Sequence, residues 1–472
     1  MPNYDYDIVT IGLGPAGMAV AAMGAEMGLK VCAIEKNRIG GECLNIGCIP
    51  SKALLRMAKT RHTFNKLSEM ELSGSGLPEP GDLFGKIAKD LKYINDNKTV
   101  GMFKKVDLHL GEGAASFVDP HTVEVGGKKI TARRIFIATG TRPRLLPLPG
   151  LEEVEVLTNE NIFHLKTVPR SMVIIGGGAI GCEMAQAFSR LGCRCAIVQA
   201  DPFLIPNGDP EAGELLEKIF ADEGIQVFNS RKIEGIEKDG DGVTVRTDKG
   251  ERISGERLLM AVGRKIDLAP LKLENAGVET TPAGAVKVDG YLRTTQKHIY
   301  GIGDCNGYWQ LSHAAMHQGM IAIMNSMLPW KAKRNFLSYA VPWAVFTEPQ
   351  ISYVGLREKE LKEKGIRYET IRVNYGDYGA AIAENVAVGF VKVFASPAGK
   401  IHGVSIAGEG SGEMINEWAL AIQKKIRLHD ILLQQHAFPT MGFLSKRAAE
   451  IWMMKKMGST TVQKICRWLF RR

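Results

Sequence analysis

Two cysteines in the segment GGECLNIGCIPSK, Cys43 and Cys48, have the spacing of a redox centre. With four residues between them, their sulfurs can close a small disulfide ring. The pair opens a predicted helix, and a helix N-terminus lowers the pKa of a thiol and favours the reactive thiolate. An isolated pair of this spacing is more often two buried, inert cysteines. The interpretation therefore depends on the elements around the pair.

The first of these elements is a glycine-rich turn near the start of the chain. The segment YDIVTIGLGPAGMAVAAMGAEMGLKVCAIEK reads as strand, turn, helix and strand, with Gly12, Gly14 and Gly17 in the turn. Such a turn lets the backbone approach a pyrophosphate, and the helix N-terminus behind it offers amide donors. Glu35 ends the second strand, where an acid can bind ribose hydroxyls. This unit is predicted to bind a dinucleotide.

The same pattern returns in SMVIIGGGAIGCEMAQAFSRLGCRCAIVQ, with Gly176, Gly178 and Gly181 in the turn. Two such turns in full strand, turn and helix context predict two dinucleotide-binding domains. Gln199 stands where NAD-preferring domains carry Asp or Glu, and the following ADPFLIPNG has no Arg or Lys for a 2′-phosphate. The choice between NADH and NADPH stays open, with a slight preference for NADH.

The remaining pattern predicts an α/β fold of two Rossmann-like domains and a separate C-terminal α+β domain. The apolar strands IFIATG and LLMAVG, which end at Gly140 and Gly263, close the two nucleotide domains, and alternating strands follow from about residue 340. The expected domains are 1–149 and 276–340 (a first dinucleotide-binding domain in two parts), 150–275 (a second dinucleotide-binding domain), 341–450 (the α+β domain) and 451–472 (a basic amphipathic tail).

Composition argues against several other classes of protein. The chain of 472 residues has a net charge of +9, but six basic residues and no acid lie between Lys455 and Arg472, so no general nucleic-acid surface is expected. Its eight cysteines form neither a disulfide scaffold nor paired zinc motifs. The acidic start is unlike a signal peptide, and no apolar run reaches the ~20 residues of a membrane span. A cytoplasmic protein without a bound metal is predicted.

In these features the chain resembles the pyridine nucleotide-disulfide oxidoreductases, the family of dihydrolipoamide dehydrogenase, glutathione reductase and mercuric reductase. The matching segments are GLGPAG, GGECLNIGCIPSK, ATGTRP, GGGAIGCE, AVGR, GIGDC and VPWAVFTEPQISYVG, in the order of the family. The resemblance extends from Tyr6 to about Glu450. It implies that 1–149 and 276–340 form an FAD-binding domain, that 150–275 form an NAD(P)-binding domain, and that the C-terminal α+β domain, 341–450, is a dimerisation domain. It implies an FAD enzyme that takes hydride from NAD(P)H and passes electrons to a disulfide formed by Cys43 and Cys48.

The resemblance also implies roles for individual residues. Cys43 would be the interchange thiol that faces the substrate, and Cys48 the thiolate that lies against the flavin. Lys52 and Glu183 match an ion pair beside the reactive edge of the flavin. The residues implied in cofactor binding are Gly12, Gly14, Gly17, Glu35, Gly41, Thr139, Gly140 and Asp304 for FAD, and Gly176, Gly178, Gly181, Gln199 and Gly263 for the nicotinamide nucleotide.

The chain departs from the family where an acid-base pair is expected. Relatives that act on small dithiols carry a histidine directly before the proline of a C-terminal HPT motif and a glutamate five residues later. Here HAFPTMGFLSKRAAE has Phe438 and Phe443 at those two positions. His436 lies two residues away and is not expected to point the same way. Fast reduction of lipoamide or glutathione disulfide is therefore not expected, because thiol protons need an acid-base group.

Three interpretations remain for the acceptor. The first is a mercuric-reductase-like or other atypical enzyme whose acceptor needs no thiol protonation, although the chain lacks a C-terminal Cys-Cys pair. The second is an enzyme like ketopropyl-coenzyme M oxidoreductase/carboxylase, in which a phenylalanine at the position of Phe438 keeps protons from a carbanion. The third is a flavoprotein subunit that docks on a partner or membrane. A soluble transhydrogenase is disfavoured because that relative lacks the first cysteine.

The last residues of the chain support the third interpretation. In STTVQKICRWLFRR, apolar residues fall at helical spacing with basic residues opposite, so residues 459–472 could lie on the inner face of an anionic membrane. The alternative is that this helix packs on its own dimer or frays. The resemblance implies a homodimer in which the Phe438 segment of one chain faces Cys43 of the other. The physiological electron acceptor is not predicted.

Overall fold

The structure is a computed structural model that describes residues 3–74 and 76–472. It divides into two compact units, each built from three separate stretches of the chain. The first unit comprises residues 1–57, 79–169 and 257–339 and contains the first glycine-rich turn. The second unit comprises residues 58–78, 170–256 and 340–472 and contains the second turn and the C-terminal domain.

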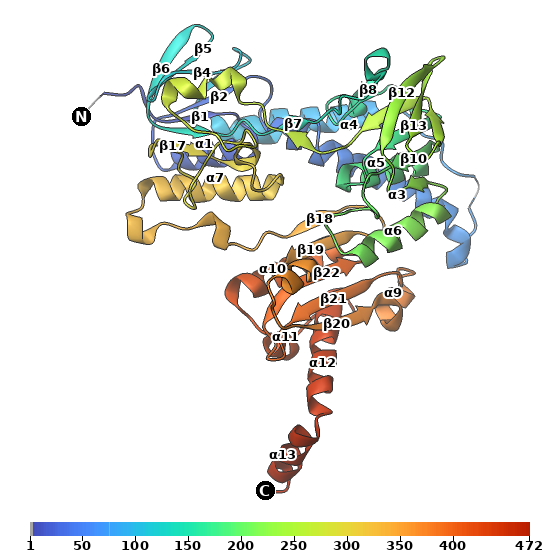
Figure 1. Cartoon of the computed structure of the whole chain (residues 1–472). Coiled ribbons are helices and arrows are strands. Elements are labelled where there is room, and N and C mark those ends of the chain that lie inside the picture. Colours follow the sequence, from blue (N-terminus) through green and yellow to red (C-terminus); the bar gives the residue numbers. More distant parts are fainter. Residues whose placement is uncertain (1–2, 75) are drawn as a thin grey trace. The chain divides into compact units, whose positions relative to one another are not determined.

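The first unit is built on a mostly parallel sheet (Figure 1). Its strands follow the order β3-β2-β1-β6-β5-β4, and β17 also pairs with β6. Strands β1, β2, β3, β6 and β17 are parallel, whereas β4 and β5 form an antiparallel extension. The strands are β1 (Tyr6–Ile11), β2 (Val31–Glu35), β3 (Asp107–Leu110), β4 (Ser116–Asp119), β5 (Thr122–Val125), β6 (Lys128–Ile137) and β17 (Ile299–Gly301).

Two long helices cover one face of this sheet. Helix α1 (Pro15–Glu26) packs closely on α7 (Ser312–Met327), because Gly319 has no Cβ that would clash with the backbone of Ala16. The remaining elements are α2 (Gly41–Asn45), the start of α3 (Cys48–Asn65), α4 (Leu83–Ile94), a parallel pair β8 (Val156–Leu157) and β15 (Arg257–Met260), and an antiparallel pair β7 (Arg142–Pro143) and β16 (Arg264–Lys265).

The second unit repeats the strand, turn and helix order. Strands β9 (Ser171–Ile175), β10 (Arg194–Val198) and β11 (Gln226–Phe228) are parallel, with α5 (Ala179–Arg190) between the first two and α6 (Pro210–Asp222) before the third. A three-stranded antiparallel sheet follows, formed by β12 (Ile233–Asp239), β13 (Gly242–Thr247) and β14 (Arg252–Gly255). The predicted α/β class with two Rossmann-like domains is confirmed.

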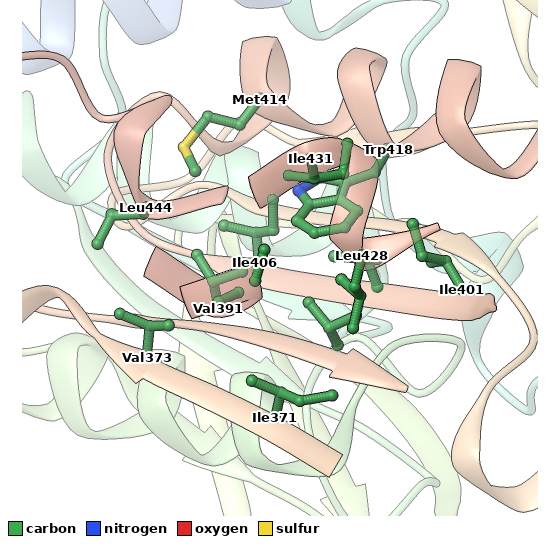
Figure 2. Packing of buried hydrophobic residues seen from close by; sticks show 14 of the residues in the cluster. Ile371, Val373, Val391, Ile401, Ile406, Met414, Trp418, Leu428, Ile431 and Leu444 are labelled. Carbon is green, nitrogen blue, oxygen red and sulfur yellow. The ribbon is translucent and has the colours of Figure 1, made fainter. Parts of the chain in front are cut away.

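The C-terminal domain of this unit is an antiparallel sheet covered by helices. Its strand order is β18-β19-β22-β21-β20. Trp418, which is fully buried on α10, lies at the centre of the apolar core with Ile406 and Leu428 (Figure 2). The elements are β18 (Trp343–Val345), β19 (Ile351–Gly355), α8 (Glu358–Glu363), β20 (Glu369–Asn374), α9 (Gly379–Ala383), β21 (Phe390–Ala395), β22 (Ile401–Ala407), α10 (Ser411–Lys424), α11 (Leu428–Leu433) and α12 (Phe443–Met457).

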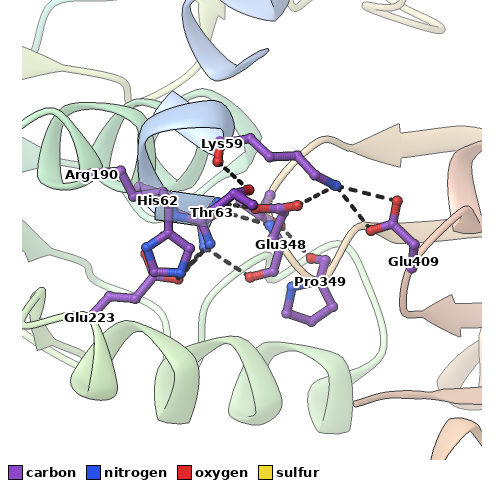
Figure 3. Close-up of polar contacts among 10 residues, drawn as sticks. Lys59, His62, Thr63, Arg190, Glu223, Glu348, Pro349 and Glu409 are labelled. Atoms are coloured by element: carbon purple, nitrogen blue, oxygen red, sulfur yellow. Dashed lines mark hydrogen bonds and ion pairs between the residues drawn. The ribbon is translucent and has the colours of Figure 1, made fainter. Parts of the chain in front are cut away.

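A charged network ties the parts of the second unit together (Figure 3). Arg190 on α5 is 6% exposed in its side chain and pairs with Glu223 at 2.6 Å and with Glu348. Lys59 pairs with the same Glu348 and with Glu409 at 3.2 Å. Because an unpaired buried charge is costly, the ion pairs with these carboxylates compensate the buried guanidinium. The network fixes the loop before Pro349 against α5.

The chain ends in a further helix, α13 (Thr460–Phe470), beyond α12 (Figure 1). Helix α12 runs without a break across residue 450, where the sequence predicted the end of the dimerisation domain, and the separate terminal helix begins only at Thr460. Among the residues that the structure describes, no helix is long and apolar enough to cross a membrane.

Candidate functional site

The two cysteines of the predicted redox centre lie in contact in the first unit. Cys43 is on the short helix α2 and Cys48 is the first residue of α3, so the turn between the helices brings the thiols together. Both have free thiols and are partly exposed. A hydrogen bond to Cys48 and then burial raise the pKa of the Cys43 thiol, while Ser312 and Lys52 lower it. The Ser312 hydroxyl lies 3.3 Å from the Cys48 sulfur.

The glycine turn after β1 touches the start of the cysteine segment. The amide of Gly40 donates to the carbonyl of Leu13 at 2.8 Å, and a Cβ on Gly41 would lie 2.8 Å from the Cα of Gly14. Gly41 also has a φ of +55°, which favours glycine. The first two residues of the GGECLNIGC segment therefore set the cysteines beside the predicted pyrophosphate turn.

The first turn fits a dinucleotide. Gly12 has a φ of +100° and Gly17 packs on its carbonyl, whereas nothing lies within 4 Å of a Cβ built on Gly14. Helix α1 begins after Gly14 without a side-chain cap, so its first amide groups can bind phosphate oxygens. Glu35 accepts a hydrogen bond from the amide of Leu13 at 2.8 Å, which fixes its carboxylate at the end of β2.

Other predicted FAD residues meet at the same edge of the sheet. Gly301 of β17 is in register with Ile137 of β6, so Asp304 follows one strand where Thr139 and Gly140 follow the other. The carboxyl ends of parallel strands are the usual place for a ligand in an open α/β sheet. Asp304 accepts from the Thr141 hydroxyl at 3.1 Å, and burial raises the pKa of its carboxyl against the opposing effect of Arg264.

Arg264 joins this edge to the cysteine segment. Its guanidinium pairs with Glu42, the residue before Cys43, donates to Thr141 and lies 3.8 Å from Asp304. Burial raises the pKa of the Glu42 carboxyl, and Arg264 opposes that rise. The arginine therefore balances two carboxylates that would otherwise be poorly solvated.

The second glycine turn repeats the geometry of the first. Gly176 has a φ of +107°, a Cβ on Gly178 would meet nothing within 4 Å, and Gly181 packs on the carbonyl of Gly176. Gln199 accepts from the amide of Gly177 at 2.6 Å, as Glu35 does from Leu13, and donates to the carbonyl of Phe203. The turn fits a second dinucleotide, with a neutral amide where the first has a carboxylate.

Three further predicted residues are placed within their own units. Lys52 lies one helical turn after Cys48 and is close enough to lower the pKa of Cys43. Glu183 is a buried residue of α5 in the second unit, and it accepts a hydrogen bond from the amide of Phe346 at 3.0 Å. Gly263, with a φ of +97°, follows β15.

The position of the missing acid-base histidine is occupied by an aromatic cluster in the second unit. Phe438 is 70% exposed and packs edge-on against Phe443 at 5.3 Å and Tyr378 at 6.4 Å. His436 packs edge-on against Phe443 at 6.4 Å, but its Nε2 atom lies 2.9 Å from Glu417 and its side chain is only 7% exposed. No side chain of this cluster combines exposure with a titratable group near neutral pH.

Sequence reasoning missed Ser312 and the roles of Glu42 and Arg264. Ser312 comes from LSHAAMHQ, 264 residues after Cys48, and no local signal links the two. The sequence did contain a weak signal for the ion pair, since Glu42 lies within the cysteine motif and Arg264 within AVGR.

The other cysteines and histidines of interest are structural in character. Cys182, Cys193 and Cys195 are buried, and burial raises the pKa of the Cys182 thiol. His317 on α7 packs edge-on against Tyr339 at 4.4 Å, and burial lowers its pKa. No group of three or more acidic, histidine or cysteine side chains among the described residues could hold a metal ion.

The chain is similar to known flavoenzymes over nearly its whole length. The pyridine nucleotide-disulphide oxidoreductase family matches residues 6–319, and its dimerisation domain matches residues 341–448. A mercuric reductase of Bacillus cereus is 33% identical over 93% of this chain and 70% of its own length. A dihydrolipoyl dehydrogenase of Thermus scotoductus is 33% identical over 94% of this chain and 97% of its own length.

Solved structures agree with this result. The HOCl-induced flavoprotein disulfide reductase RclA from Escherichia coli has a TM-score of 0.84 and 26% identity, over 95% of this chain and 100% of that chain. Its Cu(II) complex has a TM-score of 0.83 and 26% identity, over 93% of this chain and 98% of that chain.

The chain therefore belongs to the pyridine nucleotide-disulphide oxidoreductase family. It is a flavoprotein oxidoreductase of the FAD- and NAD(P)-dependent disulfide type, and the matched dimerisation domain supports a homodimer.

Proposed function

We propose that this enzyme passes electrons from NADH through FAD to a Cys43–Cys48 disulfide, and from there to a thiophilic acceptor that needs no protonation by the enzyme. The observation that carries this proposal is the aromatic cluster around the exposed Phe438, together with the burial of the His436 side chain in contact with Glu417. A disulfide substrate leaves as two thiols and needs protons, whereas a metal ion does not.

The residues at the two glycine turns would hold the cofactors. Bound FAD would supply hydride acceptance and two-electron transfer to the disulfide. The proposed FAD residues are Gly12, Gly14, Gly17, Glu35, Gly41, Thr139, Gly140 and Asp304, and the proposed nicotinamide residues are Gly176, Gly178, Gly181, Gln199 and Gly263. Lys52 and Glu183 are proposed to act at the reactive edge of the flavin, as the resemblance to the family implies.

The cysteines would carry the chemistry of the second half-reaction. Two electrons would open the disulfide, and a Cys48 thiolate could then accept hydrogen bonds from the Cys43 thiol and from the Ser312 hydroxyl, which lies 3.3 Å from the Cys48 sulfur. Cys43 is the proposed contact with the acceptor. When two electrons leave to one divalent mercury ion or to two Cu(II) ions, the sulfur-sulfur bond forms again, and no proton has to be delivered to a product.

Two relatives support a metal ion as the acceptor. One of the similar proteins is a mercuric reductase, and the Escherichia coli flavoprotein reductase has been solved as a Cu(II) complex. Soft metal ions bind thiolates well, so an exposed dithiol is a suitable site for them. The proposed setting is the cytoplasm, where thiols stay reduced.

The acceptor is tested by reducing the anaerobic enzyme with NADH and mixing it with different oxidants. The expected result is that Hg(II) or Cu(II) reoxidises the dithiol about 10²-fold or more faster than lipoamide or glutathione disulfide, the size of a missing acid-base contribution. Reoxidation is followed through the flavin absorbance. Equal or faster reaction with lipoamide would contradict the proposal.

The preference for NADH is supported by the groups around Gln199. Asp201, two residues later, is exposed and would repel a 2′-phosphate. The nearby Arg231, whose amide donates to the carbonyl of Gln199, has its guanidinium bound to Glu251 at 2.7 Å and to the carbonyl of Asn229 at 2.8 Å. The site thus offers no uncommitted cation among these residues.

We expect NADH to reduce the flavin more efficiently than NADPH in anaerobic absorbance titrations and rapid mixing. An exposed charge contributes up to about 1 kcal/mol, so Asp201→Asn is expected to shift the ratio of kcat/KM values toward NADPH by roughly fivefold. Glu214→Gln removes an exposed carboxylate from α6 and serves as the control with unchanged preference. A wild-type enzyme that prefers NADPH would overturn this assignment.

A further inference from the structure

Helix α13 is an exposed element with no role in the proposed reaction. It follows a break at Gly458 and Ser459, and none of its side chains is buried. Phe470 is 93% exposed and Leu469 is 56% exposed. Large apolar side chains that are this exposed on a short helix indicate a surface that binds another molecule or a membrane.

The helix has two distinct faces. At 100° per residue, Val462, Ile465, Cys466 and Leu469 lie along one side, and Lys464, Arg467 and Arg471 lie on the opposite side. Trp468 and Phe470 fall at the two borders between the faces. Trp at such a border is typical of helices that lie at a membrane surface, where the ring sits at the level of the headgroups.

The positive charge of α13 is not compensated within the described residues. No acidic residue follows Glu450 in the sequence. Lys455 and Lys456, on α12, are both paired with Glu369. By contrast, Arg467 donates to the carbonyl of Gln463 within its own helix, and the Arg472 guanidinium stacks at 4.0 Å from the Trp468 ring.

We propose that α13 docks the enzyme on an anionic lipid surface, with its apolar face in the headgroup boundary and its basic face toward lipid phosphates. Charge complementarity favours lipid over a second copy of this helix, because lipid phosphates can pair with the basic face of α13, whereas a second α13 offers it no acidic residue. With 11 residues the helix is about 16 Å long, which is too short to span a bilayer but sufficient to lie in its surface.

The experiment uses the full-length holoenzyme and sedimentation with vesicles. Vesicles of phosphatidylcholine with 30% phosphatidylglycerol are expected to bind the wild-type enzyme, and pure phosphatidylcholine is expected to bind it at least tenfold more weakly. Each basic residue near such a surface contributes about fivefold to the partition coefficient, equivalent to about 1 kcal/mol. The variant Lys464→Gln/Arg467→Gln/Arg471→Gln should therefore lose about 100-fold, and added salt should weaken binding of the wild type.

Two further variants distinguish docking through α13 from a general attraction of a basic protein to anionic vesicles. Ile465→Gln/Leu469→Gln keeps the charge and is expected to lose vesicle binding as well. Lys359→Gln/Lys362→Gln/Lys364→Gln removes equal charge at and beside the exposed helix α8 and should leave binding unchanged. Flavin reduction by NADH should be the same in all variants.

Three outcomes would overturn the proposal. The first is equal binding of the wild-type enzyme to neutral and anionic vesicles. The second is loss of binding in the α8 variant but not in the α13 variants. The third is a change in the oligomeric state of the α13 variants, measured by sedimentation velocity, without a change in their vesicle binding. The last outcome would identify α13 as a contact between two copies of this chain.

Discussion

Replacing Cys43 with serine is expected to reduce turnover with any acceptor by about 10³-fold or more, because the thiol that we propose contacts the acceptor is lost. The flavin should still be reduced by NADH, since that step uses neither cysteine directly. The measurement is steady-state turnover beside anaerobic reduction of the flavin. Cys466→Ser, at an exposed cysteine of α13, is the matched control and should keep full activity.

Substitutions at Cys43 also test whether this residue stabilises a thiolate at Cys48. The hydrogen bond with Cys48 raises the pKa of Cys43, so Cys43 would keep its proton and donate to the proposed Cys48 thiolate; serine could still donate, but alanine could not. A hydrogen bond to a charged group is worth about 1.5–3 kcal/mol, so Cys43→Ala should raise the pKa of the Cys48 thiol by roughly one to two units relative to Cys43→Ser. The thiolate fraction, which is present above the pKa, is then lost at a higher pH in the alanine variant.

The pH titration of the long-wavelength thiolate-to-flavin absorbance band measures this difference. Identical titrations in the serine and alanine variants would show that Cys43 does not support the thiolate. Full turnover in Cys43→Ser would remove the disulfide from the electron path altogether, and the protein would then be better described as a docked flavoprotein subunit.

The elements around these cysteines differ in how far the sequence could predict them. The two glycine turns were recognisable because their chemistry is local: each requires glycines at fixed spacing between a strand and a helix. The structure adds the equivalence of Glu35 and Gln199, which bind the amide at the same position of the two turns. The sequence identified both residues by their place at the end of a strand.

Contacts between distant segments could not be predicted in the same way. The pairing of Arg264 with Glu42 joins residues 222 positions apart, and Ser312 approaches Cys48 only because β17 and α7 return to the edge of the first sheet. The structure also supplies a partner for His436 that the sequence did not indicate, because Glu417 comes from a different helix, α10. Such partners depend on topology, which spacing within one segment does not reveal.

The last and most direct test of the acceptor is to restore the acid-base pair. Phe438→His/Phe443→Glu should increase reduction of lipoamide by about 10²- to 10⁴-fold, the range that general acid-base catalysis contributes. The imidazole would take and return thiol protons in the proposed dimer, and the carboxylate five residues later would orient it. The rate should depend on a group with a pKa near 6.5 that the wild type lacks.

Matched variants separate this gain from a loosened aromatic cluster. Phe443 packs flat against Tyr378 at 6.1 Å, so the double variant is expected to be less stable, and flavin retention and thermal unfolding must be measured beside activity. Phe438→Asn/Phe443→Glu opens the cluster equally without a titratable ring and should gain nothing. His436→Gln should leave acceptor rates unchanged, because the His436 side chain is buried against Glu417, whereas Phe438 is exposed. If His436→Gln instead abolished disulfide reduction, the chain would use a relocated acid-base group, and a proton-independent acceptor would no longer be required.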